Sequence, residues 1–343
     1  MTRTSVPAWP SRISGEPVSK RRSRPREAIA ARSAGSSSPK NPTRRSAPVA
    51  VMGRRYRPGL RGRDVVVQAA RVIVPSPSFR DSESMTTTGT DVPAFGTLAW
   101  ARARGGRMSR WEQVREGALS TRTLGPLMAA RAADRLGVPV RNGASLDADE
   151  LTVPDSKIAR EADEECRTTT SPLLYNHSVR TYFWGLMLAK RDGLDPDREL
   201  FFVASMLHDL TLDATHRDHA RMACFAARGG ILADEWSEAR GLDVVRRATL
   251  SNAISLHLNA RIDPSFGPEA VLLQAGAGVD TIGLRYRHLD PGSVTRVLKR
   301  YPRHDLKASL PQTFAHEAHA GTRTAFLKSI GFNRLVRTSQ FAE

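Results

Sequence analysis

Residues 200–209 read Leu-Phe-Phe-Val-Ala-Ser-Met-Leu-His-Asp. The first eight are apolar except for Ser205, so they predict a helix that is buried on most sides. His208 and Asp209 follow directly. Burying an ionised carboxylate is costly unless it is paired or binds a cation, and a neighbouring imidazole suits a divalent metal. For these two residues alone, a helix that ends in a polar pair is the favoured interpretation.

Two further residues of metal-ligand type lie in apolar surroundings. His177 is 31 residues before His208 in a stretch that predicts an apolar helix, and Asp280 is 71 residues after Asp209. Asp280 ends the small-residue segment 274–280, Gln-Ala-Gly-Ala-Gly-Val-Asp, whose glycines are expected to allow close helix packing. Four such residues on three helices can converge on one ion in a helical bundle.

The rest of the chain after residue 85 shows helical periodicity and no convincing period-2 alternation, which predicts an all-α fold. We expect helices over 124–136, 154–167, 175–191, 197–209, 218–228, 244–258, 268–284, 292–301 and 313–330. The expected domains are a disordered segment (1–84), a helical extension (85–150), a metal-binding helical domain (151–330) and a tail (331–343).

The formal charge of +17 is concentrated at the front of the chain. Residues 1–84 hold 18 Lys and Arg against 5 Asp and Glu, a net of +13, and residues 85–343 hold 34 against 30, a net of +4. The basic segment is rich in Arg, Ser and Pro, which predicts disorder. It is interpreted as a nonfunctional tail or sequence upstream of a start at Met85 or Met108, with a polyanion-binding arm or a transit peptide as alternatives.

Cysteine usage and hydropathy narrow the class of protein. Cys166 and Cys224 are the two cysteines, which excludes a disulfide framework, a four-cysteine zinc module and an iron–sulfur cluster. No stretch approaches the roughly 18 apolar residues of a membrane-spanning helix. We therefore expect a soluble, cytoplasmic protein that does not bind membranes, of unknown oligomeric state.

The ordered set of ligand types carries a family resemblance. Residues 175–182, Tyr-Asn-His-Ser-Val-Arg-Thr-Tyr, followed by Leu207-His208-Asp209-Leu210, resemble the HD-domain superfamily of metal-dependent hydrolases, in particular its cyanamide-hydratase-like branch. The resemblance spans about 152–314. It implies an HD-domain-like helical bundle that binds one divalent metal ion (Zn, Fe or Mn) through His177, His208, Asp209 and Asp280.

Two further residues are candidates for the chemistry. His257 lies on an apolar helix, and the branch is similar in having a histidine there; it is either a buried core residue, an extra ligand or the acid/base that handles the substrate proton. Arg180, three positions after His177, either orients a ligand carboxylate, binds an anionic substrate or forms a structural ion pair.

Other patterns receive simpler interpretations. His316-Glu317-Ala318-His319 has its histidines three apart, not four, so a zinc-protease site is excluded. Residues 301–303, with Lys307, are interpreted as a helix stop followed by a solvated basic turn.

The resemblance implies an enzyme, a metal-dependent hydrolase or hydratase in which a metal-activated water attacks a small nitrile-like or other small-molecule substrate. One alternative is a phosphohydrolase acting on a nucleotide or phosphate ester, although many of those enzymes continue the doublet with Gly-Lys where this chain has Leu210-Thr211. A second alternative is a nucleic-acid or polyanion-binding protein that acts through its basic tail. Otherwise the expected partner is a small-molecule substrate.

Overall fold

The computed structural model describes residues 93–147, 149–219 and 222–343. The basic segment 1–84, with its predicted disorder, lies outside the described residues. Within them the expected all-α class is confirmed, since the regular elements are helices and the only β pairings are isolated bridges. The boundaries at 84, 150 and 330 stay predictions. No helix in the part of the chain that is described is long and apolar enough to cross a membrane.

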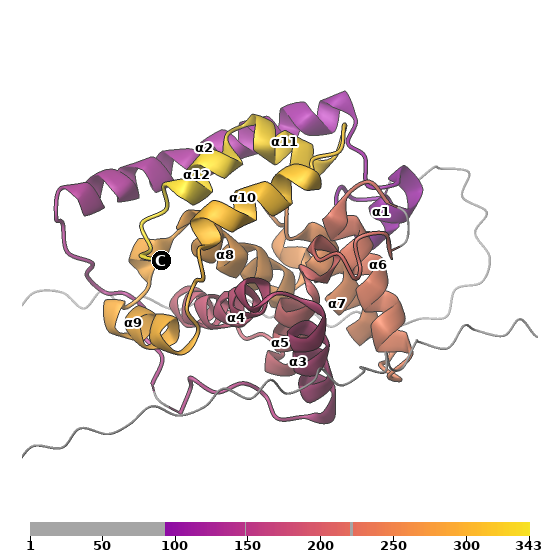
Figure 1. Cartoon of the computed structure of the whole chain (residues 1–343), viewed down its shortest axis with the longest axis horizontal. Helices are drawn as coiled ribbons and strands as arrows, with labels where there is room; N and C mark the ends of the chain where they lie inside the picture. Colours follow the sequence, from indigo (N-terminus) through magenta and orange to yellow (C-terminus); the bar gives the residue numbers. More distant parts are fainter. Residues whose placement is uncertain (1–92, 148, 220–221) are drawn as a thin grey trace, which may run out of the picture. The chain divides into compact units, whose positions relative to one another are not determined.

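Twelve α-helices and three short 3₁₀ helices make up the described part (Figure 1). The α-helices are α1 (Leu98–Arg104), α2 (Arg110–Arg135), α3 (Lys157–Thr169), α4 (Pro172–Asp192), α5 (Arg198–Leu207), α6 (Phe225–Glu238), α7 (Val244–Leu256), α8 (Pro268–Ile282), α9 (Pro291–Arg300), α10 (Leu306–His316), α11 (Arg323–Ser329) and α12 (Phe332–Arg337). The 3₁₀ helices are η1 (Leu210–Leu212), η3 (Pro264–Phe266) and η4 (Tyr286–His288).

Several helices begin and end at residues whose chemistry explains the boundary. Ser171 caps α4 with Pro172 at its first position, and Gly193 ends it in the left-handed conformation (φ 68°). The cap of α5 is Asp197, whose Oδ1 accepts the backbone N–H of Glu199 and of Leu200. The helix therefore begins after Asp197, one residue later than in the expected range 197–209, and ends before His208.

The core that positions the candidate residues is formed by α4, α5, α7 and α8. Large side chains such as Trp184 and Phe201 are fully buried between these helices. Helices α4 and α8 approach closely at Gly276, where an added Cβ would lie 2.3 Å from the backbone oxygen of Thr181. A glycine is required there because no side chain fits between the two backbones, as the small-residue stretch predicts.

Three expected helices differ from the observed ones. The helix expected over 124–136 begins at Arg110 instead, because Ser109 and Glu112 form a capping box. The helix expected over 218–228 is displaced to Phe225–Glu238 and continues through Gly230. An added Cβ at Gly230 would lie 1.9 Å from Ser255 Oγ of α7, so this glycine serves helix contact and does not end the helix.

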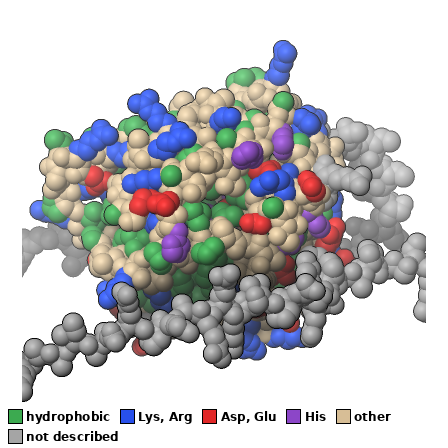
Figure 2. Space-filling model, in the orientation of Figure 1, with side chains coloured by type: hydrophobic (Ala, Val, Ile, Leu, Met, Phe, Trp, Pro, Cys, Tyr) green, Lys and Arg blue, Asp and Glu red, His purple; other side chains and the backbone are tan. Residues whose placement is uncertain are grey.

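The helix expected over 313–330 is two helices, α10 and α11, separated by residues 317–322. The break places Glu317 in the interior, where its carboxylate pairs with Arg228 and lies 3.2 Å from Arg217 Nε. On the face shown in Figure 2, basic and acidic side chains are interspersed. That distribution agrees with the near-balanced charge of residues 85–343.

Candidate metal centre

The ends of helices bring the candidate residues together. His177 lies in the first half of α4, His208 caps the C-terminus of α5 with Asp209 next to it, and His257 caps the C-terminus of α7. All four side chains are buried, and Asp280 of α8 is completely so. The apolar run that precedes His208 is buried, as its composition predicts, and the polar pair that follows it is buried as well.

Three imidazole rings surround the Asp209 carboxylate. Their Nε2 atoms lie 3.4 Å (His177) and 3.3 Å (His208) from Oδ2 and 3.6 Å (His257) from Oδ1. The His208 ring has its centroid 5.2 Å from that of His177, tilted by 50°, and 5.1 Å from that of His257, to which it is perpendicular.

The opposite ring nitrogens have acceptors that set the tautomers. Nδ1 of His208 lies 2.8 Å from the carbonyl of Ser205, and Nδ1 of His257 lies 2.7 Å from the carbonyl of Ile254. Because a carbonyl only accepts, these Nδ1 atoms carry the hydrogen, and each neutral ring presents the Nε2 lone pair toward the carboxylate. In the described part of the chain, His208 Nε2 is buried without a hydrogen-bond partner.

Lone pairs directed at a carboxylate repel it unless a proton or a cation lies between them. The ligand atoms of His177, His208 and Asp209 lie within 4.8 Å of one another, a spacing suited to one metal ion. Imidazole with carboxylate is a donor set used by zinc, iron and manganese. The residues present therefore fit a divalent cation.

Asp280 has a different position from these three. Its carboxylate accepts from Arg180 Nε and Nη2 and from Trp184 Nε1, each at 2.8 Å, and lies 2.7 Å from His177 Nδ1. Arg303 donates to the Asp280 backbone oxygen at 2.8 Å. Asp280 is thus placed to orient His177, as carboxylates behind metal-bound histidines commonly do, and stands outside the group of three ligand atoms.

Arg180 is placed in a structural ion pair. Two of its nitrogens bind Asp280, and Nη1 donates to the carbonyls of Tyr301 and Pro302. The guanidinium is fully buried, and its donors are directed at the interior of the protein. Of the three roles considered from the sequence, the geometry favours the ion pair with a carboxylate that orients a candidate ligand.

Arg303 corrects the interpretation of 301–303 as a solvated basic turn. The side chain is buried, donates to Asp280, pairs with Glu343 at 3.1 Å and lies 4.8 Å from the centroid of the Phe341 ring. Its partner Asp280 lies 23 residues earlier in the sequence, and no local pattern predicts this contact. Sequence reasoning missed it for that reason.

The electrostatics follow from burial and these contacts. Burial on its own would raise the pKa of the Asp209 carboxyl, but His208, His177 and His257 outweigh it and hold that pKa well below its usual range. Burial lowers the pKa of His257 to about 3 and also lowers that of His208. Burial also opposes the charged form of His177, but Asp209 and Asp280 outweigh it and raise its pKa.

The Asp280 carboxyl is held ionised by the two arginines. Burial would raise its pKa, but Arg180 and Arg303 outweigh burial and keep the pKa well below its usual range. The centre therefore combines an anionic Asp209 with a neutral His257, the form of imidazole that accepts a proton or a metal.

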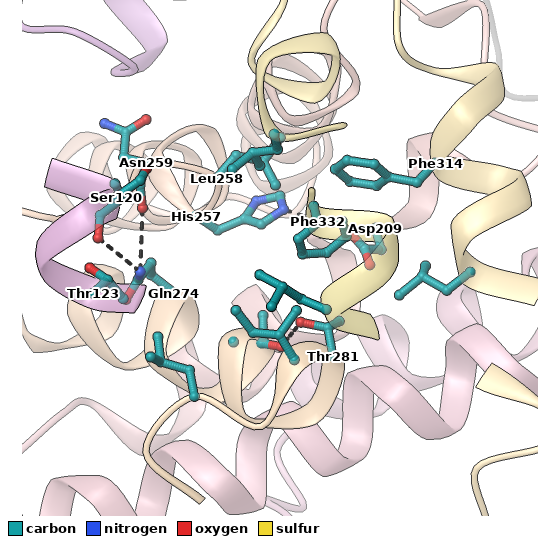
Figure 3. Close-up of a pocket in the computed structure, with 18 of the residues that line it drawn as sticks. Ser120, Thr123, Asp209, His257, Leu258, Asn259, Gln274, Thr281, Phe314 and Phe332 are labelled. Atoms are coloured by element: carbon teal, nitrogen blue, oxygen red, sulfur yellow. Dashed lines mark hydrogen bonds and ion pairs between the residues drawn. The ribbon is translucent and has the colours of Figure 1, made fainter. Parts of the chain in front are cut away.

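The centre opens into a cavity of about 130 Å³. His177, His208, Asp209 and His257 line one side of it. In Figure 3, Asp209 lies near Phe314 and Phe332, and Ser120, Thr123, Asn259 and Gln274 gather at the opposite end. The walls from α2, α10, α11 and α12 carry no signal of a site in the sequence, and sequence reasoning missed them.

The side chains of residues 316–319 do not come together as a group of metal ligands. His316 is exposed, and Glu317 is buried against Arg228. This arrangement agrees with the exclusion of a zinc-protease site. The sequence was also compared with protein-family models and with curated proteins, and neither comparison finds a match.

Proposed function

We propose that the protein is a metal-dependent hydrolase or hydratase of the HD-domain type, with His177, His208 and Asp209 as metal ligands. The observation that carries the proposal is the convergence of three buried imidazole Nε2 atoms on one buried carboxylate beside a cavity. The His, His-Asp and Asp order in the sequence supports the same family. A divalent cation bound there supplies a Lewis acid and lowers the pKa of a coordinated water.

His257 is proposed as the group that moves the proton. It lines the cavity, its Nδ1–H is held by the carbonyl of Ile254, and its Nε2 lone pair is available beside Asp209. With a nitrile substrate, His257 accepts a proton as the water oxygen bonds to the nitrile carbon. It then returns that proton to the nitrogen, and the product tautomerises to an amide, so that one water is added overall.

Asp280 and Arg180 are proposed as positioning residues. The Asp280 carboxylate accepts the Nδ1–H of His177 and thereby directs Nε2 toward Asp209. Arg180 fixes that carboxylate through two hydrogen bonds. The phosphate-ester alternative has less support, because Arg180 is already engaged and does not face the cavity lining. The tail-based alternative concerns residues outside the described part.

Elemental analysis of the purified protein tests the proposal. The comparison includes the variant His208→Ala/Asp209→Ala and a control with the same number of substitutions, His316→Ala/His319→Ala, which removes two exposed histidines. Circular dichroism checks that each remains helical. Near-stoichiometric zinc, iron or manganese in the parent and control, lost from the first variant, supports the proposal; metal in none of them after loading with each ion overturns it.

Metal-loaded protein is then incubated with cyanamide and other small nitriles beside phosphate esters. Conversion of a nitrile to the amide, or of cyanamide to urea, is the expected result. The His257→Gln variant is expected to keep its metal and lose most of the turnover, since the amide side chain does not exchange a proton. Release of inorganic phosphate alone would instead favour the phosphohydrolase alternative.

A further inference from the structure

The walls of the cavity beside the metal centre are mostly apolar. Six of the apolar side chains that line it are Leu212, Phe225, Leu310, Phe314, Leu327 and Phe332. They come from η1, α6, α10, α11 and α12, so the cavity is enclosed by segments far apart in the chain. Apolar walls stabilise an apolar ligand by removing its surface from water.

No Lys or Arg lines the cavity among the residues that the structure describes. Two arginines that bind residues near the centre are already engaged: Arg180 binds Asp280, and Arg323 donates from Nη1 to the Ser255 carbonyl and to Asn259 Oδ1. A phosphate monoester carries about two negative charges at pH 7. The bound cation can pair part of that charge, but no arginine or lysine of the described residues lines the cavity to pair the rest, and burying the remainder against apolar walls is unfavourable.

The end of the cavity away from Asp209 is polar but uncharged. Ser120 and Thr123 of α2 line it together with Gln274 of α8, whose amide nitrogen donates to the backbone oxygens of Asn259 and Ala260 at 3.3 and 3.5 Å (Figure 3). Hydroxyl and amide groups bind neutral polar groups without requiring an opposite charge. The polar end therefore offers hydrogen bonds to a neutral ligand and, among the described residues, no charged side chain that would favour an ion.

The volume limits the size of the ligand. At about 130 Å³ the cavity is close to the ~150 Å³ of an engineered apolar cavity that binds benzene in another protein. A ring with one small substituent matches this space.

We propose that the site takes uncharged molecules with an apolar body about the size of a substituted benzene ring, and that it excludes nucleotides and other phosphate esters. The inference deepens the proposed function and rests on it for the position of the reacting group at the metal end. The apolar walls and the absence of lining Lys or Arg side chains are features of the described residues and do not depend on the metal.

Four probes of one ring size test the inference. Benzonitrile and benzamide are neutral, and benzoate and phenyl phosphate are anions. Binding is measured by isothermal titration calorimetry on the full chain, as metal-loaded protein whose metal content is determined on the same sample. We expect dissociation constants below about 1 mM for at least one neutral probe and at least tenfold weaker binding of both anions.

A matched pair of variants locates the binding. Thr123 lines the cavity and is half-buried, whereas Thr121, two residues earlier on α2, is exposed and does not line it. Thr123→Trp is expected to weaken the neutral probe at least tenfold by filling the polar end, and Thr121→Trp to leave it within twofold. Circular dichroism and thermal unfolding confirm that both variants fold.

The outcomes separate this inference from the proposed function. Binding of phenyl phosphate as tightly as benzonitrile, no binding of either neutral probe, or equal effects of the two tryptophans would overturn the ligand class, whatever the metal content. Protein that binds benzonitrile in the expected manner but holds no metal would retain the ligand class and overturn the hydrolase proposal.

Discussion

Replacing Gly276 by alanine tests whether the spacing of α4 and α8 sets the metal centre. The added Cβ would lie 2.3 Å from the Thr181 backbone oxygen and 3.2 Å from the Gly185 nitrogen. Neither atom belongs to a side chain that can rotate away, so the two helices must separate by about 1 Å to restore an ordinary van der Waals contact. Overpacking of this kind costs about 1–3 kcal/mol, offset by up to ~1 kcal/mol of better helix propensity.

The separation occurs one helical turn from the hydrogen bond between His177 and Asp280. Thr181 is four residues after His177 on α4, and Gly276 is four residues before Asp280 on α8, so the 2.7 Å contact between these side chains is expected to lengthen. Loss of a carboxylate behind a metal-binding histidine commonly lowers metal affinity 10–100-fold. We expect Gly276→Ala to be destabilised by about 1–2 kcal/mol and to bind metal at least tenfold more weakly.

Urea unfolding of the metal-free protein gives the first quantity, and competition with a chelator of known affinity gives the second. Gly278→Ala is the control on the same helix, because its added Cβ would meet only the Leu284 side chain, the nearest atom at 3.2 Å. It is expected to unfold with unchanged or slightly higher stability and to keep its metal affinity. A Gly276→Ala protein with parental stability and parental affinity would refute the view that helix spacing positions His177.

The remaining predictions concern charge and protons at the same centre. Asp280→Asn leaves the buried Arg180 without its counter-charge and leaves Arg303 paired with Glu343 alone, so we expect a loss of about 3–5 kcal/mol in urea unfolding; a loss below 1 kcal/mol would contradict the buried ion pair. In metal-free protein the folded-state pKa of His257 is about 3, below its ordinary value of 6.5, so the unfolded chain binds the proton first and stability falls as the pH drops from 6.5 toward 3. The variant His257→Gln no longer takes up this proton on unfolding, so the slope of its unfolding free energy against pH is expected to fall by up to about 1.4 kcal/mol per pH unit. An unchanged slope would show that His257 stays protonated in the fold. Added zinc at 100 times its dissociation constant is expected to stabilise the parent by about 2.7 kcal/mol and to leave His208→Ala/Asp209→Ala unchanged, as measured by urea unfolding with and without the ion.

The sequence predicts the buried His and Asp residues of the candidate centre because local composition is enough to recognise them. An aspartate after the apolar run 200–207 and a histidine within an apolar helix stand out without knowledge of their neighbours. The all-α class follows from periodicity in the same way. The roles are harder to assign, because whether Asp280 faces an ion or a histidine depends on the direction of α8 relative to α4.

Contacts between distant segments account for what sequence reasoning missed. Gly229-Gly230 looks like a helix stop, yet α6 continues because α7 needs the space that a side chain at Gly230 would occupy. Arg303 looks like part of a solvated turn, yet it is buried because Asp280 lies beside it. In both cases tertiary contact overrides a local preference that is worth about 1 kcal/mol or less per residue.

The candidate metal ligands and the cavity walls come from different parts of the fold. The three candidate ligands lie on α4 and at the end of α5, and His257 lies at the end of α7, all inside the segment 152–314 in which the sequence resembles the HD-domain pattern. Ser120 and Thr123 precede that segment, and Leu327 and Phe332 follow it. A change in α2, α11 or α12 can therefore alter which ligand fits without moving a metal ligand. The proposed reaction therefore rests on the residues of the candidate metal centre, and the proposed substrate class rests on the cavity walls.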